Sequence, residues 1–168
     1  MPYFILILII IFLLTFAYAF IRAIGWVPMW HKDIDSVMKL ADIKPGEKFC
    51  DLGCGDGKVV LAAGKKQAKA VGYEISLLLY FIAKVRAWFS KGQVEIKFRD
   101  FWLVNLRDMD IVFFFLIPRI FPKMKAKLEK ELKPGSRVIT YVWPMEGWTA
   151  IQVIKREKGP AIYLYKIN

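Results

Sequence analysis

The sequence contains a single histidine, His31, and only two cysteines, Cys50 and Cys54. Two cysteines are too few for the disulfide framework of a small secreted domain, and a metal site built on them would lack further ligands. We therefore predict no disulfide and no metal centre, and we interpret both cysteines as small buried residues in a reducing compartment. Because the chain also shows no repeat and no low-complexity segment, we expect one domain behind its N-terminal stretch.

Charge is absent from the start of the chain. Residues 3–21 carry no charged side chain, are rich in Ile, Leu and Phe, and are followed by Arg22. At about 1.5 Å per helical residue, this stretch just reaches across a hydrocarbon core of about 30 Å. No basic segment precedes it, unlike in a cleaved signal peptide. The sequence therefore predicts a transmembrane anchor over residues 1–22 and a domain over residues 23–168.

All 26 Lys and Arg residues follow this stretch, as do all 15 acids, so the net charge of +11 belongs to the predicted domain. By the positive-inside bias, that domain is expected in the cytoplasm of a single-pass membrane protein. An anionic lipid surface is the economical explanation of the charge. Nucleic-acid binding and plain solubility are the alternatives.

A glycine-rich turn is the most informative motif. Residues 50–57 read Cys-Asp-Leu-Gly-Cys-Gly-Asp-Gly at the end of an apolar run, which predicts a strand entering a helix over residues 58–67. Glycines at 53, 55 and 57 permit positive φ and let a ligand approach the main chain. The helix directs its unpaired N–H groups at the same place. The order Asp-x-Gly-x-Gly-x-Gly differs from the Gly-x-Gly-x-x-Gly of dinucleotide sites.

Acidic residues on both sides of this turn indicate the ligand. Asp51 and Asp56 would repel a pyrophosphate but suit a ligand with a cation and hydroxyl groups, which points to S-adenosylmethionine. Glu74, at the end of the next apolar run, is placed to accept the ribose hydroxyls. The alternative is an ordinary glycine-rich turn with two solvated carboxylates. The cofactor contacts predicted here are Asp51, Gly53, Cys54, Gly55, Asp56, Gly57, Tyr73 and Glu74.

Short apolar runs alternate with helical patterns after residue 33. This alternation predicts an α/β fold, a doubly wound, Rossmann-like sheet with helices on both faces and a terminal β-hairpin. Strands are expected at 48–52, 70–74, 94–99, 110–116 and 137–143, the hairpin at 151–155 and 161–166, and further helices at 33–41 and 122–132. The helix beginning near residue 77 is apolar on every face, so it is either buried in the core or pressed against a bilayer or a membrane partner.

The ends of the later strands are expected to complete the pocket. Asp100 can accept a hydrogen bond from the adenine amino group, and Phe101 and Trp102 can cover the ring. We predict that the residues that end the fourth and fifth strands form the pocket for the molecule that accepts the methyl group of S-adenosylmethionine. They are Phe115, Leu116, Ile117, Pro118, Tyr141 and Trp143.

Two features of that pocket bear on the acceptor. Enzymes that methylate base nitrogens often carry Asn or Asp before Pro-Pro-aromatic, and this side chain accepts a hydrogen bond from the amino group of the base. Leu116-Ile117-Pro118 has no such side chain. This disfavours a flipped base as the substrate and nucleic acid as a partner. The apolar walls suit an aliphatic amine. We identify no convincing general base; Glu146 is a weak candidate, equally explained as a solvated turn residue.

Taken together, these motifs resemble the class I, seven-strand protein lysine methyltransferases, nearest to the membrane-anchored mitochondrial members and their small broad-specificity prokaryotic relatives. The resemblance implies S-adenosylmethionine as cofactor, lysines of membrane or membrane-associated proteins as acceptors, and further cofactor contacts from Trp26, Val27 and Pro28. Met29 departs from the threonine usual in the family. The motifs that carry the resemblance are residues 27–28, 51–57, 72–74, 86–88, 100–102, 117–118, 127–132, 134–135, 137–139 and 147–148.

Two alternatives remain open from the sequence. The first is a methyltransferase that acts on a membrane lipid or a quinone-type small molecule. The second is a membrane module that binds the cofactor without turnover.

Overall fold

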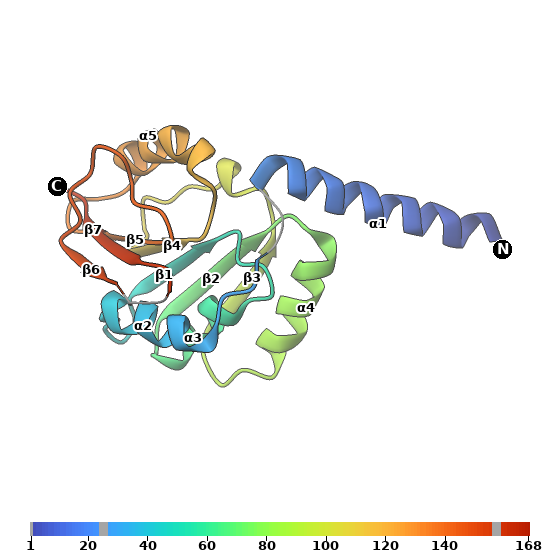
Figure 1. Ribbon diagram of the computed structural model, residues 1–168. Coiled ribbons are helices and arrows are strands. Elements are labelled where there is room, and N and C mark those ends of the chain that lie inside the picture. The colour runs from blue at the N-terminus through green and yellow to red at the C-terminus, as the bar shows by residue number, and fades with distance from the viewer. Residues whose placement is uncertain (1, 24–26, 156–158) are drawn as a thin grey trace.

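The computed structural model describes residues 2–23, 27–155 and 159–168, with side chains described outside residues 2 and 15–23. Over these residues the strands form one seven-stranded sheet in the order β3-β2-β1-β4-β5-β7-β6 (Figure 1). The first five strands are parallel, and β7 and β6 form an antiparallel hairpin at one edge. The strands are β1 (Lys48–Leu52), β2 (Lys69–Glu74), β3 (Val94–Phe98), β4 (Ile111–Phe114), β5 (Arg137–Tyr141), β6 (Gln152–Ile154) and β7 (Ile162–Lys166). The predicted Rossmann-like sheet and terminal hairpin are confirmed.

Helices cover both faces of this sheet. The helices α2 (His31–Ala41), α3 (Lys58–Lys65) and α4 (Leu77–Trp88) pack on one face, and α5 (Phe121–Glu131) packs on the other. Successive residues of β1 supply the two apolar clusters, because side chains alternate across a strand. Phe49 belongs to the cluster under α2 and α3, whereas Cys50 and Leu52 belong to the cluster under α5.

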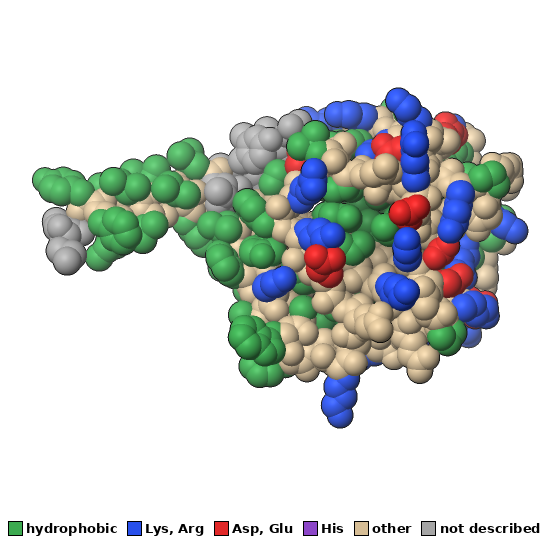
Figure 2. All heavy atoms as spheres, turned by 180° about the vertical axis from the view of Figure 1, so that it is seen from behind, with side chains coloured by type: hydrophobic (Ala, Val, Ile, Leu, Met, Phe, Trp, Pro, Cys, Tyr) green, Lys and Arg blue, Asp and Glu red, His purple; other side chains and the backbone are tan. Residues whose placement is uncertain are grey.

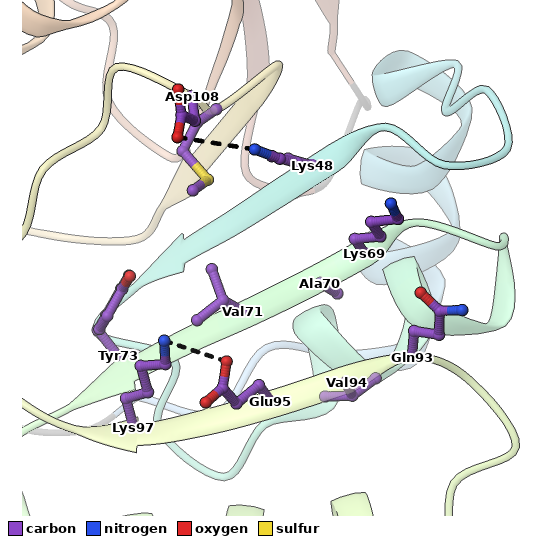
Figure 3. A pocket seen from close by; sticks show the side chains of 11 residues that line it. Lys48, Lys69, Ala70, Val71, Tyr73, Gln93, Val94, Glu95, Lys97 and Asp108 are labelled. Carbon is purple, nitrogen blue, oxygen red and sulfur yellow. Dashed lines mark ion pairs between the residues drawn. The ribbon is translucent and has the colours of Figure 1, made fainter.

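The connection from β3 to β4 contains a short 3-10 helix, η1 (Phe101–Leu103), and no longer helix among the described residues. A hollow of about 430 Å³ therefore remains on the α5 side of β2 and β3 (Figure 3). Two ion pairs border it, Lys48 to Asp108 at 3.7 Å and Lys97 to Glu95 at 3.1 Å.

A close backbone approach joins α3 to the turn before β3. A Cβ added at Gly92 would lie 2.6 Å from the carbonyl oxygen and 2.8 Å from the Cα of Gly64, and closer still to its carbonyl carbon. We expect Gly92→Ala to lower the free energy of unfolding by about 1–3 kcal/mol, because backbone atoms must move. Thermal denaturation should show a melting temperature lower by roughly 2–4 °C per kcal/mol. Lys91→Ala, an exposed neighbour, is the control, and equal melting of both variants would contradict the packing argument.

The N-terminal helix α1 (Pro2–Ala23) corrects one prediction. Among the residues whose side chains are described, no helix is long and apolar enough to cross a membrane. The predicted single-pass membrane protein with a cytoplasmic domain is therefore wrong, and the predicted transmembrane anchor over residues 1–22 is not supported. The anionic lipid surface, which was inferred from that anchor, loses its support.

The apolar helix α4 is not buried on every face. Leu79 and Ala83 are buried, whereas the side chains of Phe81, Val85 and Trp88 are 56%, 56% and 86% exposed. The helix α1 lies beside α4, and Figure 2 shows α1 projecting from the domain with apolar side chains along it. The interpretation of α4 as a fully buried core helix is excluded, and its outer face is an exposed apolar stripe.

Candidate functional site

The glycine turn lies at the carboxyl ends of the parallel strands, beside the point where the strand order reverses between β1 and β4. Ligands of open α/β sheets bind at such a point. Gly53, Gly55 and Gly57 have φ values of +79°, +54° and +82°, a region that other residues rarely adopt. The N–H groups of Gly53 and Cys54 both donate to the Tyr73 carbonyl, at 2.9 and 3.0 Å, which fixes the turn against β2.

Glu74, the last residue of β2, is bound by the turn on one side and by the start of α4 on the other. Its carboxylate accepts hydrogen bonds from the N–H groups of Gly55 at 2.8 Å, Ile75 at 2.8 Å and Ser76 at 2.7 Å. Burial raises the pKa of Glu74, and these three backbone donors act in the opposite direction. The carboxylate thus orders both segments that meet at the strand ends.

Asp51 lies under the same turn and is 2% exposed. Burial, together with the negative charges of Glu74 and Asp56, raises its pKa well above the ordinary value of 3.8, while the N–H of Val60 in α3 lowers it. Neighbouring buried acids are costly without a counter-charge. The arrangement therefore favours a ligand that brings positive charge.

Asp56 has its counter-charges within the protein. Its carboxylate pairs with Arg86 of α4 at 2.5 Å and with Lys58 at 3.2 Å, and Arg86 also donates to the Asp56 carbonyl at 3.0 Å. Arg86 thereby ties α4 to the glycine turn. The sequence did not assign this role to Arg86, although it follows the buried Leu79 and Ala83 at helical spacing, which indicates the same side of α4.

A buried polar atom beside Glu74 also fits a ligand. Ser76 is 1% exposed, and its Oγ has no hydrogen-bond partner among the described residues. Unsatisfied buried hydroxyls are uncommon in folded proteins. A nucleoside cofactor at this edge of the sheet would offer the hydroxyl a partner. S-adenosylmethionine therefore fits three features of the site: the glycine main chain, which a ligand can approach closely, the buried acids and this hydroxyl.

The other predicted cofactor residues are spread more widely. Asp100 accepts a hydrogen bond from the Trp102 N–H at 2.9 Å and so caps η1. Phe101 and Tyr73 pack into the apolar cluster on the α5 side, and Cys54 is buried against β2. The Nζ of Lys123 lies 4.3 Å from the centre of the Trp102 ring.

The segment predicted to fold over the cofactor is described only in part. Trp26 lies outside the described residues. Val27 and Pro28 are exposed, whereas Met29 is buried in the apolar cluster that includes α2.

The predicted acceptor residues gather at the ends of β4 and β5. The Phe115 and Tyr141 rings are perpendicular with centres 4.7 Å apart, and the Trp143 ring centre is 6.1 Å from that of Phe115. Leu116 is buried over the turn, with its Cδ2 3.4 Å from the place of a Cβ on Gly53. Ile117 is half-buried, and Pro118 is exposed at the start of η2 (Pro118–Ile120).

An unusual backbone links two of these aromatics. Val142, between Tyr141 and Trp143, has a φ of +76°, a conformation that is strained for a β-branched residue. The turn is held by Thr140 Oγ1, which donates to the Trp143 carbonyl at 2.8 Å, and by the Val142 N–H, which donates to the Ala161 carbonyl at 2.8 Å. The surrounding structure therefore stabilises the arrangement of the two rings.

One buried acid near the pocket was missed. Asp33, in the first turn of α2, is 0% exposed, and its Oδ2 accepts a hydrogen bond from the Tyr141 hydroxyl at 2.6 Å. The signal was its position four residues before the apolar Val37, on the inward stripe of that helix. Glu146, the weak base candidate, is exposed.

Comparison with known proteins identifies the class and then the family. The structure superimposes on a crystal structure described as an RNA methyltransferase from Salinibacter ruber in complex with S-adenosyl-L-homocysteine, with a TM-score of 0.79, 28% identity, and coverage of 84% of this chain and 94% of that one. The profile of the ANTKMT methyltransferase domain matches residues 51–152. The chain therefore belongs to the ANTKMT methyltransferase family.

Curated relatives agree with this family. A protein-lysine N-methyltransferase of Saccharolobus islandicus is 32% identical over 89% of this chain and 98% of its own length. The adenine nucleotide translocase lysine N-methyltransferase of Mus musculus is 34% identical over 82% of this chain, but only 60% of that protein is covered. The predicted class, an S-adenosylmethionine-dependent methyltransferase that resembles the protein lysine methyltransferases, is confirmed.

Proposed function

We propose that this chain transfers a methyl group from S-adenosylmethionine to lysine side chains of a protein acceptor, and that residues 23–168 form the domain responsible. The observation that carries the acceptor is the group of three aromatic rings, Phe115, Tyr141 and Trp143, at the carboxyl ends of β4 and β5. The lysine methyltransferases among its relatives support the same acceptor.

We infer that the cofactor is held by the residues that border the turn. Glu74 and the Ser76 hydroxyl would contact the ribose side, and Asp51 would face the methionyl ammonium. Asp100 and Trp102, with Val27 and Pro28, are the further contacts that we propose. S-adenosylmethionine would supply an activated methyl group: the amine lone pair would form the new nitrogen–carbon bond, and the electron pair of the broken carbon–sulfur bond would stay on sulfur.

The chain's own part is to present a neutral, oriented amine. A lysine ammonium has an ordinary pKa near about 10.4 and must lose a proton before it can attack. An apolar enclosure disfavours the charged form, so walls of aromatic side chains promote that loss. Fixing the amine against the reacting carbon removes much of the entropic cost of the encounter.

The test is to identify the acceptor with radiolabelled S-adenosylmethionine. An extract of the cells that naturally produce this chain is divided into protein, lipid and RNA fractions, and each fraction is incubated with the purified chain and the labelled cofactor. We expect label in protein, recovered as methylated lysine after acid hydrolysis, and none with Glu74→Ala. Label in the lipid or quinone fraction, or in RNA as the described activity of the Salinibacter ruber protein suggests, would overturn the proposal. Cofactor binding without label in any fraction would favour a binding module.

A further inference from the structure

We propose that Tyr141, held by Asp33, distinguishes acceptor amines by their number of N–H groups and so determines how many methyl groups are added. This inference rests on the proposed lysine methylation and goes beyond it to the product. Its basis is the hydrogen bond from the Tyr141 hydroxyl to Asp33 Oδ2, 2.6 Å long and buried.

The direction of that hydrogen bond determines what the hydroxyl can do next. A tyrosine hydroxyl has one proton to donate and two lone pairs that accept. Because the hydroxyl donates to Asp33 Oδ2, this proton is already used. Any further partner of the Tyr141 oxygen must therefore be a donor, and an amine N–H is such a donor.

The aromatic rings beside Tyr141 suit a small amine. The Phe115 ring stands perpendicular to the Tyr141 ring, and the centre of the Trp143 ring is 6.1 Å from that of Phe115. Tyr141 is 5% exposed and its hydroxyl is buried on Asp33, whereas Phe115 and Trp143 are half-buried. The strained φ of +76° at Val142 sets Tyr141 and Trp143 against one ring, as expected where strain serves a function.

Counting N–H groups follows from the chemistry of successive methylation. A neutral lysine amine has two N–H groups, a monomethylated amine has one, and a dimethylated amine has none. An N–H donated to the Tyr141 oxygen orients the first two acceptors, and their lone pair remains for the new bond. The third addition gains nothing from this oxygen. Tyr141 therefore favours the first additions, and Asp33 acts through it as a positioning residue.

The test compares two acceptor peptides that carry the lysine labelled in the first experiment, one unmodified and one dimethylated. For Tyr141→Phe we expect the rate on the unmodified peptide to fall about tenfold, the loss of one hydrogen bond, and the rate on the dimethylated peptide to change less than twofold. Mass spectrometry should show the products shifted toward trimethyl-lysine. Equal losses on both peptides would overturn the inference.

Asp33 is tested by rescue. Asp33→Asn keeps an oxygen that accepts from the Tyr141 hydroxyl and should keep most of the preference, whereas Asp33→Ala should lose it as Tyr141→Phe does. Asp35→Asn, an exposed acid on the same helix, is the matched control. If Asp33→Asn loses the preference as fully as Asp33→Ala, the orienting role is overturned.

Two binding measurements separate this role from a structural one. Calorimetry with S-adenosylhomocysteine should give an unchanged cofactor affinity in Tyr141→Phe. Unmodified and trimethylated peptides should bind the cofactor-loaded variant equally, whereas the wild type prefers the unmodified one. Weakened cofactor binding would place Tyr141 in the cofactor site and overturn the inference. A wild-type chain that methylates no lysine would overturn the proposed function, and an active wild type with no peptide preference would overturn the inference alone.

Discussion

Replacing Glu74 with alanine is expected to weaken S-adenosylmethionine binding by at least about 100-fold, measured by calorimetry. The carboxylate accepts three backbone hydrogen bonds that order the glycine turn and the start of α4. A carboxylate offers about four acceptor sites, so these donors leave about one for a ribose hydroxyl. Hydrogen bonds to charged groups contribute about 1.5–3 kcal/mol each, and the variant removes the loop's order together with the ligand's acceptor.

The matched control is Glu95→Ala on the neighbouring strand β3. Glu95 is exposed and pairs only with Lys97 in the described contacts, so its loss should leave the cofactor affinity within twofold. Comparable losses in both variants would mean that the sheet rather than the site was damaged. An unchanged affinity in Glu74→Ala would refute the assignment of the site.

The glycine turn was predictable because its signals are local. The strand at residues 48–52 was predicted with the bounds that β1 has, since a short apolar run ending in a turn suffices to place it. Three alternating glycines predicted a backbone with positive φ, and all three have it. The acid at the end of β2 follows from the same pattern. Sequence neighbours carry all of this information.

Contacts between distant residues were not predictable in the same way. Asp33 and Tyr141 are 108 residues apart, and Asp56 and Arg86 are 30 apart. Which side chains meet depends on how α2 and α4 pack on the sheet. The spacing of Asp33 and Arg86 from apolar residues of the same helix indicates on which side of the helix each lies, but not which groups they reach. For the same reason the sequence could not decide whether α4 is buried in the core or has an exposed apolar face, because its composition is apolar in both cases.

The prediction of an anchor, which the structure does not support, came from apolar length alone. Residues 3–21 are uncharged, and the structure does form a helix there, α1. A span also requires a continuous apolar helix that matches the thickness of the membrane, and the described residues do not supply one. The charge argument had depended on that span, so the predicted lipid surface failed with it.

The buried carboxylate of Asp51 leads to the second large effect, in which stability and cofactor binding change in opposite directions. Burial raises its pKa well above the ordinary value of 3.8, so the folded chain holds this proton more tightly than the unfolded chain does. The stability linked to this group is therefore fully present below that ordinary value and is lost as the pH rises through the raised pKa. At neutral pH and above, without cofactor, the group destabilises the fold.

Asp51→Asn removes the ionisation and nearly preserves the shape. We expect its melting temperature without cofactor to exceed that of the wild type by about 2–4 °C at pH 8, which corresponds to about 1 kcal/mol in a chain of this size. The difference should shrink as the pH falls toward 4 and disappear well below the ordinary value of 3.8, where Asp51 is neutral in both folded and unfolded chains. Thermal denaturation across this pH range measures it, and a lower melting temperature of the variant at pH 8 would contradict the argument.

The same substitution should remove the response to the cofactor. At a concentration of 100 times the dissociation constant, S-adenosylmethionine stabilises the wild type by about 2.7 kcal/mol, a shift of roughly 5–11 °C. Losing one partner of a buried charge pair costs about 3–5 kcal/mol, so the shift should vanish in Asp51→Asn. Asp108→Asn, whose side chain is 79% exposed, is the control and should keep the wild-type shift. If Asp51→Asn is more stable and still responds to the cofactor, the carboxylate is not the partner of the methionyl ammonium. If Asp51→Asn is both more stable without cofactor and unresponsive to it, then the same carboxylate charge destabilises the cofactor-free protein and binds the cofactor.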